Sequence, residues 1–383
     1  MLIYQSAVTT ALLAFLGLVL RNLRDYQTLP TPGTPPRPTE KLFILIPARN
    51  EAAHIGDCLR EALAQDWRDF TLLVLDDGST DGTDAIIAEI ATGDSRVELL
   101  RGKPIAAGWA GKVWACSQLG AEALNRGADY LLFLDADTRA KPGLVGAALQ
   151  RSQETGAGMI SAFPYQIAGS FWERVTLPMI QFLIITFLPV RMVWESPFKQ
   201  LVAGCGQFEL FSAEAYRVTG GHAAIPNSFH DGLQLARRTK AAGLAVRLFD
   251  AAPLMTCRMY EGGRAVWNGF TRNAYEGLGS PPTLLIMTAL QGLLFFCPFL
   301  FWILDFGFWI AGRGASPAAF GLITAQIAII YLIRILQAQR FGHFGSVWLH
   351  PLSIAALIAI QWASFWKTIR KKPVSWKGRT YGG

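Results

Sequence analysis

The sequence predicts an α/β domain with a parallel sheet, joined to membrane-spanning helices. Short apolar runs alternate with helical patterns, and two of the runs end in acidic residues, at Asp76-Asp77 and at Asp135-Ala136-Asp137. The membrane helices follow from composition, because 51% of the 383 residues are hydrophobic and only 16% are charged. Soluble domains usually carry about 25% charged residues. The five scattered cysteines form no CxxC pair and imply neither a zinc site nor a disulfide framework.

The α/β domain is expected over residues 41–280. We predict strands at 42–47, 70–75, 97–101 and 130–134, and helices at 52–65, 83–91, 112–126 and 233–240. Strand and helix alternation with short connections is typical of a parallel sheet covered on both faces. In such a sheet the acidic strand ends lie at the edge where ligands bind.

The N-terminal segment is predicted to be an uncleaved membrane anchor, residues 1–24. It is apolar and free of charge from residue 2 to residue 20, which is about the length that spans a bilayer. Arg21 and Arg24 follow it and place the next segment in the cytoplasm. A proline-rich stretch, residues 25–40, then serves as an extended linker.

Three further apolar stretches lie in residues 281–368 and are predicted to be membrane helices, at 284–312, 318–336 and 347–366. Asp305 and Arg334 within them need interior or interfacial positions. The stretch at about 171–194 is expected to lie in the membrane interface. A crossing there would put Asp137 and Asp231 on opposite sides of the membrane.

The C-terminal tail, residues 369–383, is basic and contains no acid. Beside an apolar helix, anionic lipid headgroups explain such a tail better than nucleic acid does. We expect a multi-pass protein of the cell inner (cytoplasmic) membrane with its α/β domain in the cytoplasm. Three full C-terminal spans would put the tail outside, against the positive-inside tendency. One of them is therefore a candidate re-entrant segment, with His350-Pro351 as a possible break.

The end of the first strand contains Pro47, Arg49 and Glu51. A polar turn that opens a helix offers backbone N–H groups, an acceptor and a cation at one point, which suits a nucleotide. An ordinary helix cap with surface charges is equally compatible. At the second strand end, Asp76 or Asp77 can accept a hydrogen bond from the N3–H of a uracil. The alternative there is a turn whose Asp81 or Thr83 caps the next helix.

Asp135 and Asp137 are the expected anchor for a divalent metal. Alternate residues of an extended segment point to opposite sides, so one carboxylate can hold a sugar while the other binds Mg²⁺ or Mn²⁺. A lone acid pair of this kind is weak evidence, but its place after a buried strand strengthens it. Lys112 follows Gly111 at a helix start and could reach a phosphate, or could simply be solvated.

Asp231 opens a helix and is predicted to be a general base that takes a proton from an acceptor hydroxyl. His230 beside it is either a ligand for metal or phosphate or a hydrogen-bonded scaffold residue. Gly204 and Gly206 would form a backbone-rich wall where the acceptor approaches, or a plain strand loosened by glycine. Farther on, Trp267 could face a sugar or sit at headgroup depth, and Arg272 could bind a diphosphate.

Together these motifs resemble the family 2 inverting glycosyltransferases, which have the GT-A (nucleotide-diphospho-sugar transferase) Rossmann-like fold. The matching segments lie within residues 42–243 and read PARNE, DDGSTDGT, GK, DAD, AGCGQFELFSAEAYRVTGG and HDGLQLA. The resemblance implies a nucleotide-sugar donor, a divalent metal at Asp137 and a catalytic base at Asp231. From the residues themselves we expect donor contacts from Pro47, Arg49, Glu51, Asp76, Asp77, Lys112, Asp135 and Arg272, and acceptor contacts from Gly204, Gly206, His230 and Trp267.

A finer resemblance points to membrane-bound members that glycosylate carotenoids or are associated with hopanoid synthesis. It rests on GKVWA at 111–115, GFTRN at 269–273 and WKGRTY at 376–381. The QxxRW motif of processive polysaccharide synthases is absent from the sequence. The expected activity is therefore transfer of one sugar, from a UDP-linked donor, to a lipid. A polyprenyl-phosphate acceptor and a non-catalytic nucleotide-sugar-binding scaffold are the alternatives. No nucleic-acid partner is expected.

Overall fold

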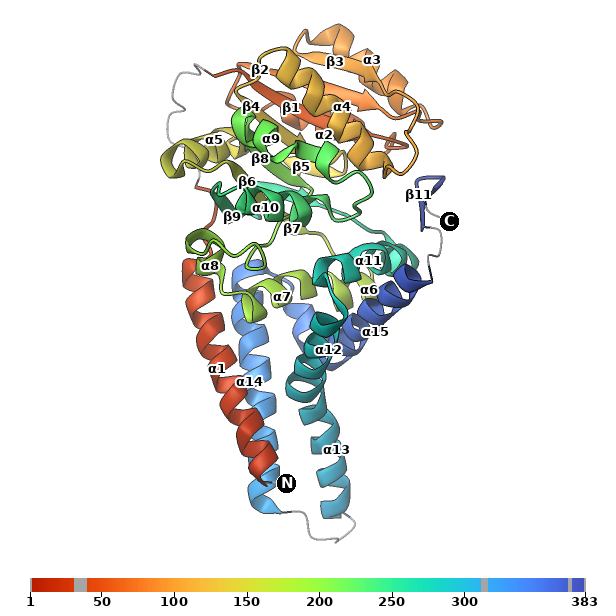
Figure 1. Cartoon of the computed structure of the whole chain (residues 1–383). Coiled ribbons are helices and arrows are strands. Elements are labelled where there is room, and N and C mark those ends of the chain that lie inside the picture. The colour runs from red at the N-terminus through yellow and green to blue at the C-terminus, as the bar shows by residue number, and fades with distance from the viewer. Residues whose placement is uncertain (1, 31–39, 311–315, 371–373, 382–383) are drawn as a thin grey trace. The chain divides into compact units, whose positions relative to one another are not determined.

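A computed structural model of the protein describes residues 2–30, 40–310, 316–370 and 374–381 (Figure 1). Most of the predicted proline-rich linker lies outside these residues, as do Lys371 and Lys372 of the basic tail. The chain divides into two compact units. We call residues 26–167, 190–259 and 371–383 the sheet unit. Residues 1–25, 168–189 and 260–370 are the helical unit.

The sheet unit is built on seven strands in the order β3-β2-β1-β4-β8-β6-β9. They are β1 (Leu42–Ala48), β2 (Phe70–Asp76), β3 (Val97–Arg101), β4 (Tyr130–Leu134), β6 (Met159–Phe163), β8 (Phe208–Ser212) and β9 (Val246–Asp250). β1 pairs in parallel with both β2 and β4, and β2 pairs in parallel with β3. These four strands have the predicted positions and directions. The strand order reverses beside β1, which is where open α/β sheets bind ligands.

The sheet is mixed rather than wholly parallel, so that part of the prediction was wrong. β8 runs antiparallel to both β4 and β6. It follows a long excursion of the chain rather than a single crossover helix, and only a helical crossover imposes a parallel direction. A second, smaller sheet contains β5 (Thr138–Ala140), β10 (Met255–Cys257) and β7 (Tyr165–Gln166).

Helices connect the strands of the sheet unit. They are α2 (Ile55–Leu63), α3 (Thr83–Gly93), α4 (Gly111–Asn125), α5 (Leu144–Thr155), α8 (Val190–Glu195), α9 (Ala213–Thr219), the short η1 (Gly221–Ala224) and α10 (Asp231–Ala241). The sequence predicts four of those described here, α2, α3, α4 and α10. The strands supply the centre of the core because their apolar side chains are covered on both faces. Ile44, Leu72 and Leu132, from three neighbouring strands, are completely buried.

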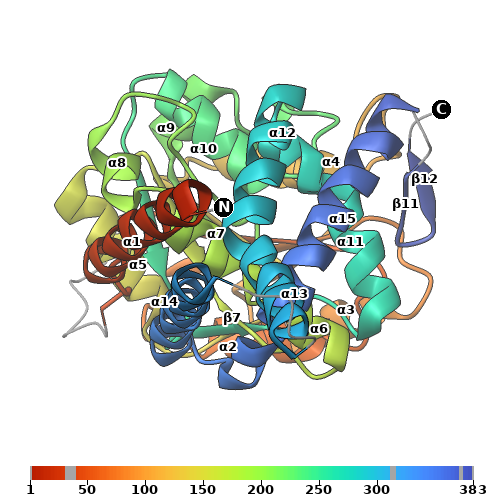
Figure 2. The ribbon, with the colours of Figure 1, turned by 90° about the horizontal axis from the view of Figure 1, so that it is seen from below.

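The helical unit contains the apolar stretches. Its elements are α1 (Leu2–Asp25), α6 (Phe171–Thr176), α7 (Met179–Phe187), α11 (Gly262–Leu278), α12 (Pro281–Leu290), the π-helical turn η2 (Gln291–Phe296), α13 (Cys297–Ile310), α14 (Pro317–Phe341), η3 (Phe344–Leu349) and α15 (His350–Ile369). Within this unit α1 packs beside α14, and α11 packs beside α15 (Figure 2). The stretch at 171–194 is broken into short helices, none of which has the length of a span.

Four helical segments of the described chain are long and apolar enough to cross a membrane. They are Leu2–Asp25, Pro281–Gly307, Pro317–Phe341 and Phe344–Ile369. Buried polar side chains join these helices, as is usual between membrane helices. Gln326 donates a hydrogen bond to the Gln5 side chain at 3.0 Å. Arg334 is buried, as predicted, and contacts Gln337 and Ser346 at 3.3 Å and 3.1 Å.

Candidate functional site

The acidic residues predicted from the strand ends lie at one edge of the sheet. β2 ends at Asp76 and β4 ends just before Asp135, and each strand pairs with β1 from an opposite side. Because all three strands are parallel, their carboxyl ends meet at the same edge. Pro47 is the residue before the last in β1, so it lies between the two acidic strand ends.

Hydrogen bonds join the loops after β1 and β2 into one surface. The Asn50 N–H donates to Ser79 Oγ at 3.0 Å, and the Thr80 N–H donates to Asn50 Oδ1 at 2.9 Å. The guanidinium of Arg49 donates to the backbone oxygens of Asp77 and Gly78. Arg49 therefore shapes the loop that holds Asp77, in addition to any contact it makes with a ligand.

Asp76 and Asp77 are both buried but have different partners. Asp76 accepts a hydrogen bond from the Ser79 N–H at 3.2 Å and lies 3.4 Å from Arg101. Burial raises the pKa of Asp77, and a contact with Arg379 opposes that effect. Asp81 accepts hydrogen bonds from the N–H and the hydroxyl of Thr83 at 3.1 Å and 2.6 Å. It therefore orders the start of α3, in line with the alternative that this residue belongs to a turn before the helix.

Lys112 joins two of the predicted acids. Its Nζ lies 2.6 Å from Asp135 Oδ1 and 2.9 Å from Asp231 Oδ2, and it donates to the Gly206 oxygen at 3.0 Å. The sequence suggested that Lys112 contacts a phosphate or the base of a nucleotide, whereas the structure pairs it with carboxylates. Lys112 thereby brings the carboxyl end of β4 together with the first residue of α10 and the loop before β8.

The predicted glycine wall has a steric cause. A Cβ at Gly206 would collide with the Asp231 carboxylate, and a Cβ at Gly204 would collide with the backbone oxygen of Gly232. The loop at 204–206 therefore packs directly against the start of α10, which only glycine permits. His230 immediately precedes α10, and its N–H donates to Ser228 Oγ at 3.0 Å.

The electrostatics of this cluster follow from one ammonium among several carboxylates. Burial raises the pKa of Asp135 to about 7, even though Lys112 attracts its charged form. Burial would also raise the pKa of Asp231, but the ion pair with Lys112 and the hydrogen bond from the Gly232 N–H lower it to about 2. Asp231 is thus ionised at neutral pH, while Asp135 is close to its titration point.

Asp137 has the features of a metal ligand. Its Oδ1 is buried and has no hydrogen-bond partner among the described residues. Burial and the neighbouring Glu51 carboxylate both raise the pKa of Asp137. Hard divalent cations take oxygen ligands of this type. Within the described ranges, no three Asp, Glu, His or Cys side chains are arranged to hold an ion by themselves.

The C-terminal hairpin also reaches this edge. β11 (Val374–Trp376) and β12 (Arg379–Tyr381) are antiparallel, and the turn between them presents Lys377. Lys377 Nζ lies 2.7 Å from Glu51 Oε1, and Arg379 forms an ion pair with Asp77. The basic tail was expected to face lipid headgroups, but these two of its cations pair with carboxylates of the sheet unit, so that expectation is wrong for both.

Residues 43–219 match the family model described as Glycosyl transferase family 2. This part of the chain is a family 2 glycosyltransferase domain. The match includes the β1, β2 and β4 strand ends together with Lys112 and Asp137, so the predicted family is confirmed.

Curated relatives of this glycosyltransferase match it along most of its length. A 4,4'-diaponeurosporenoate glycosyltransferase from Staphylococcus aureus strain MRSA252 is 29% identical over 89% of this chain and 88% of its own. The protein of the same name from strain USA300 is 28% identical with the same coverage. Among solved structures, a mannosyltransferase from Pyrobaculum calidifontis, in complex with GDP-Man and Mn²⁺, has a TM-score of 0.54 at 16% identity. It covers 96% of this chain and 99% of that one, which confirms the GT-A fold.

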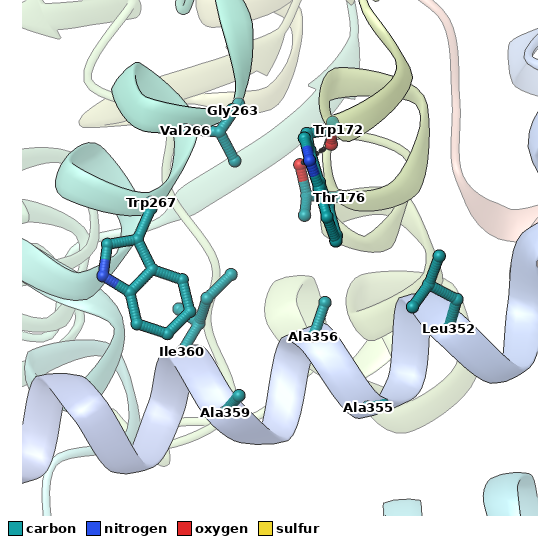
Figure 3. Close-up of a pocket in the computed structure, with 10 residues that line it drawn as sticks. All are labelled: Trp172, Thr176, Gly263, Val266, Trp267, Leu352, Ala355, Ala356, Ala359 and Ile360. Carbon is teal, nitrogen blue, oxygen red and sulfur yellow. Dashed lines mark hydrogen bonds between the residues drawn. The ribbon is translucent and has the colours of Figure 1, made fainter.

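Two residues of the glycosyltransferase predicted to touch ligands, Trp267 and Arg272, lie on α11 in the helical unit. Trp267 lines an apolar pocket of about 370 Å³ in that unit, opposite Trp172 of α6 (Figure 3). One wall is the face of α15 that carries Ala355, Ala356 and Ala359. Small side chains on this wall leave room between the two indole rings.

One part of the site was missed from the sequence. Glu209 on β8 is buried next to His222, with Oε2 3.5 Å from Nε2, and Tyr216 contacts the other ring nitrogen at 2.9 Å. Burial raises the pKa of Glu209 and lowers that of His222 to about 3, which favours the neutral form of each side chain. The available signal was a lone acid inside the apolar run of β8.

Proposed function

We propose that this glycosyltransferase moves a sugar from a nucleoside diphosphate sugar to a carboxylate-bearing apolar lipid of the carotenoid type. The relatives from Staphylococcus aureus carry the name of such an acceptor, 4,4'-diaponeurosporenoate, and match 89% of this chain, which is more than its sheet unit contains. We further propose a bacterial inner-membrane location with the sheet unit in the cytoplasm, where nucleotide sugars are made.

The observation that carries the proposal is the cluster of Lys112, Asp135 and Asp231 at the carboxyl end of β4. It places a fixed positive charge and ionised carboxylates where a GT-A sheet binds its donor. Asp76 and Asp77, at the neighbouring strand end, would hold the nucleoside. We propose a uracil base there, because a buried carboxylate oxygen is a suitable acceptor for its N3–H.

Asp137 would hold a divalent ion, Mg²⁺ or Mn²⁺. Its unpartnered buried oxygen and the nearby Glu51 carboxylate fit such an ion. Since the described side chains do not form a complete ligand set, the remaining ligands would come from the donor's phosphates. When bound, the ion offsets the negative charge that develops on the departing nucleoside diphosphate.

The ion pair of Asp231 favours a carboxylate acceptor over a hydroxyl. Lys112 Nζ lies 2.9 Å from Asp231 Oδ2 and stabilises the ionised form of this carboxyl, which makes it a weaker base towards an alcohol. A carboxylate acceptor is already ionised at neutral pH, so it has no proton to lose. Its oxygen attacks the anomeric carbon in line as the bond to the diphosphate breaks, and the configuration inverts. Asp231 then serves to hold Lys112, and would accept a proton if the acceptor were a hydroxyl.

The apolar pocket of the helical unit suits the chain of such an acceptor. Trp172 and Trp267 provide flat apolar faces, and the alanines of α15 leave the space between them open (Figure 3). A long polyene is rigid and flat, so it loses little conformational entropy on entering a pocket of this shape.

The test is a transfer assay with the purified full-length protein, a labelled UDP-sugar and Mn²⁺. The acceptors are 4,4'-diaponeurosporenoate, a hopanoid alcohol and undecaprenyl phosphate, assayed separately, with mass spectrometry of the products. We expect a product from the carotenoid carboxylate that mild alkali cleaves, because a glycosyl ester is hydrolysed and a glycoside is not. An alkali-stable product from the alcohol, or a product only from the phosphate, would replace this acceptor assignment.

The control for a metal-dependent reaction is a pair of matched variants. Asp137→Asn should lose transfer with every acceptor. Asp69→Asn, an exposed carboxylate in the loop before β2, should keep it. If the wild-type protein transferred sugar to none of the three acceptors, the proposed function would be wrong.

A further inference from the structure

The C-terminal hairpin lies against the donor edge of the sheet unit, and the assigned site does not yet use it. The backbone conformation of its turn fixes where Lys377 and Arg379 lie. Lys377 and Gly378 both have positive φ, 47° and 78°, as the two central residues of a type I′ turn require. Trp376 and Arg379 pair on either side of the turn. Lys377 therefore lies at the tip, and Arg379 begins the returning strand.

Backbone contacts anchor this turn independently of its charged side chains. The Arg49 Nε–H donates to the backbone oxygen of Lys377 at 3.1 Å. The same guanidinium donates to the backbone oxygens of Asp77 and Gly78. Arg49 thus ties the hairpin to the loop that follows β2. The turn would keep its place if the Lys377 or Arg379 side chain changed partner.

The two cations stand at the two carboxylates that frame the donor edge. Arg379 donates to Asp77 Oδ2 and, at 3.0 Å, to the Asp77 backbone oxygen. Lys377 Nζ donates to the Asn50 backbone oxygen at 3.1 Å and forms an ion pair with Glu51 at 2.7 Å. Both side chains remain about one-quarter exposed, at 23% and 27%. Neither is sealed away from a ligand that enters the site.

The charge balance of the edge shows why these cations matter. Without the hairpin, the described carboxylates Glu51, Asp76, Asp77, Asp135, Asp137 and Asp231 outnumber the cations Arg49, Arg101 and Lys112. Lys112 is already shared between two carboxylates, and Arg101 pairs with Asp76 and Asp84. A diphosphate brings further negative charge. An edge that is strongly anionic would repel it.

We propose that Lys377 and Arg379 are donor-binding residues, which supply positive charge to the diphosphate of the nucleotide. This inference rests on the proposed function, since it assumes a nucleoside diphosphate donor. Arg379 has five N–H donors, so it can hold Asp77 and a phosphate oxygen together. Lys377 reaches from the tip of the turn towards Glu51 and Asp137, which is where a phosphate would share the divalent ion.

The test measures binding of UDP and of uridine to the full-length protein in detergent, by titration calorimetry with Mn²⁺ present. Lys377→Met and Arg379→Met should each weaken UDP binding at least tenfold. Uridine has no phosphate, so its binding should change far less in Lys377→Met. Arg379→Lys keeps a charge and should retain more UDP affinity than Arg379→Met. Lys199→Met and Arg68→Met remove exposed charges elsewhere in the sheet unit and should match the wild type.

Two results of the UDP titrations would overturn the proposal. Unchanged UDP affinity in both methionine variants would mean that the cations do not touch the donor. Tighter UDP binding would mean that the hairpin blocks the site instead of completing it. Thermal melting of each variant checks folding, and Lys377→Met serves if Arg379→Met unfolds. A wild type that binds UDP without transferring sugar to any acceptor would refute the proposed function and leave this binding result interpretable. If the protein binds GDP and not UDP, the same comparison is made with GDP and guanosine. If it binds neither nucleotide, the inference is overturned.

Discussion

Lys112 Nζ lies 2.9 Å from Asp231 Oδ2, so the proposed acceptor-side carboxylate is held by a lysine from another helix. The same ammonium lies 2.6 Å from Asp135. The Lys112 ammonium thus joins the donor half of the site, at the end of β4, to the first turn of α10. It also keeps Asp231 ionised well below neutral pH.

Lys112→Met should remove this link. Loss of the ammonium removes the positive charge from the donor edge and leaves Asp135 and Asp231 as like charges that repel each other, so kcat should fall by about 10²-fold or more. Breaking a buried ion pair on one side also destabilises a protein, by roughly 3–5 kcal/mol where burial is complete and less at this half-buried site. Steady-state kinetics and thermal melting measure both effects. Wild-type kcat in Lys112→Met would contradict the assigned role, and Lys199→Met is the control.

Gly206→Ala should displace Asp231 by steric collision, since a Cβ there would overlap the carboxylate. We expect transfer to fall at least tenfold while UDP binding changes little. Gly93→Ala is the matched control. Gly93 is the exposed last residue of α3, and its added Cβ meets nothing within 4 Å. It should leave transfer intact and change stability by less than about 1 kcal/mol. Equal activity in the two variants would show that the position of Asp231 is not critical.

Chelation should abolish transfer, and added Mg²⁺ or Mn²⁺ should restore it. The donor and Asp137 together would complete the ligand set, so UDP should increase the affinity for Mn²⁺ in the wild type. Asp137→Asn should lose that increase. Electron paramagnetic resonance of free Mn²⁺ measures it without reference to turnover. An equal effect of UDP in Asp137→Asn would place the ion elsewhere.

Glu173 gives a pH prediction for the helical unit. Its carboxylate accepts from the N–H groups of Gly169 and Gly262 at 2.7 Å and 2.6 Å and from the Ser170 hydroxyl at 2.7 Å. Burial would raise the pKa of Glu173, but these hydrogen bonds lower it to about 2. A pKa that is lower in the folded state stabilises the protein above the unfolded value of 4.5. That contribution is lost as the pH falls towards 2.

Glu173→Gln should therefore be less stable than the wild type at pH 7, with a free energy of unfolding that is lower by on the order of 2–3 kcal/mol. The difference should shrink steadily between pH 5 and pH 3. Thermal melting of both proteins across this range tests it, and Glu195→Gln, whose carboxylate is exposed, serves as control. A constant difference at all pH values would show that the charge of Glu173 is not what stabilises the fold.

Ala356→Phe should fill the apolar pocket between Trp172 and Trp267. We expect the KM for the lipid acceptor to rise at least tenfold, with UDP binding unchanged. Ala363→Phe, on the same helix but outside the pocket lining, is the control. An unchanged acceptor KM in Ala356→Phe would mean that the lipid binds elsewhere.

The sequence was sufficient to predict the four parallel strands and the acids that follow them. A buried strand must be apolar throughout, so the first polar residues mark its end, and the edge follows from the parallel direction. Asp76, Asp77 and Asp135 were found in this way. The direction of β8 was not accessible, because nothing local distinguishes a parallel from an antiparallel strand once the connection is long.

Contacts between distant segments were also beyond the sequence. Arg379 and Asp77 are 302 positions apart, and the charge pattern of the tail equally fits a lipid surface. The hairpin turn at Lys377 and Gly378 was not predicted, and nothing local in the sequence shows what such a turn would touch. Lys112 was located correctly at a helix start. Its carboxylate partners lie at the end of β4 and at the start of α10, and the close approach of α10 depends on Gly204 and Gly206.

The order of segments along the chain has a practical consequence for dissecting this enzyme. The sheet unit is completed by residues that follow the last apolar helix. A water-soluble fragment ending at Met259 would contain the sheet and its acids but would lack both Lys377 and Arg379. Restoring residues 371–383 through a flexible connection would return those side chains to the fragment. Any comparison of soluble and membrane-embedded forms should therefore include that fused version.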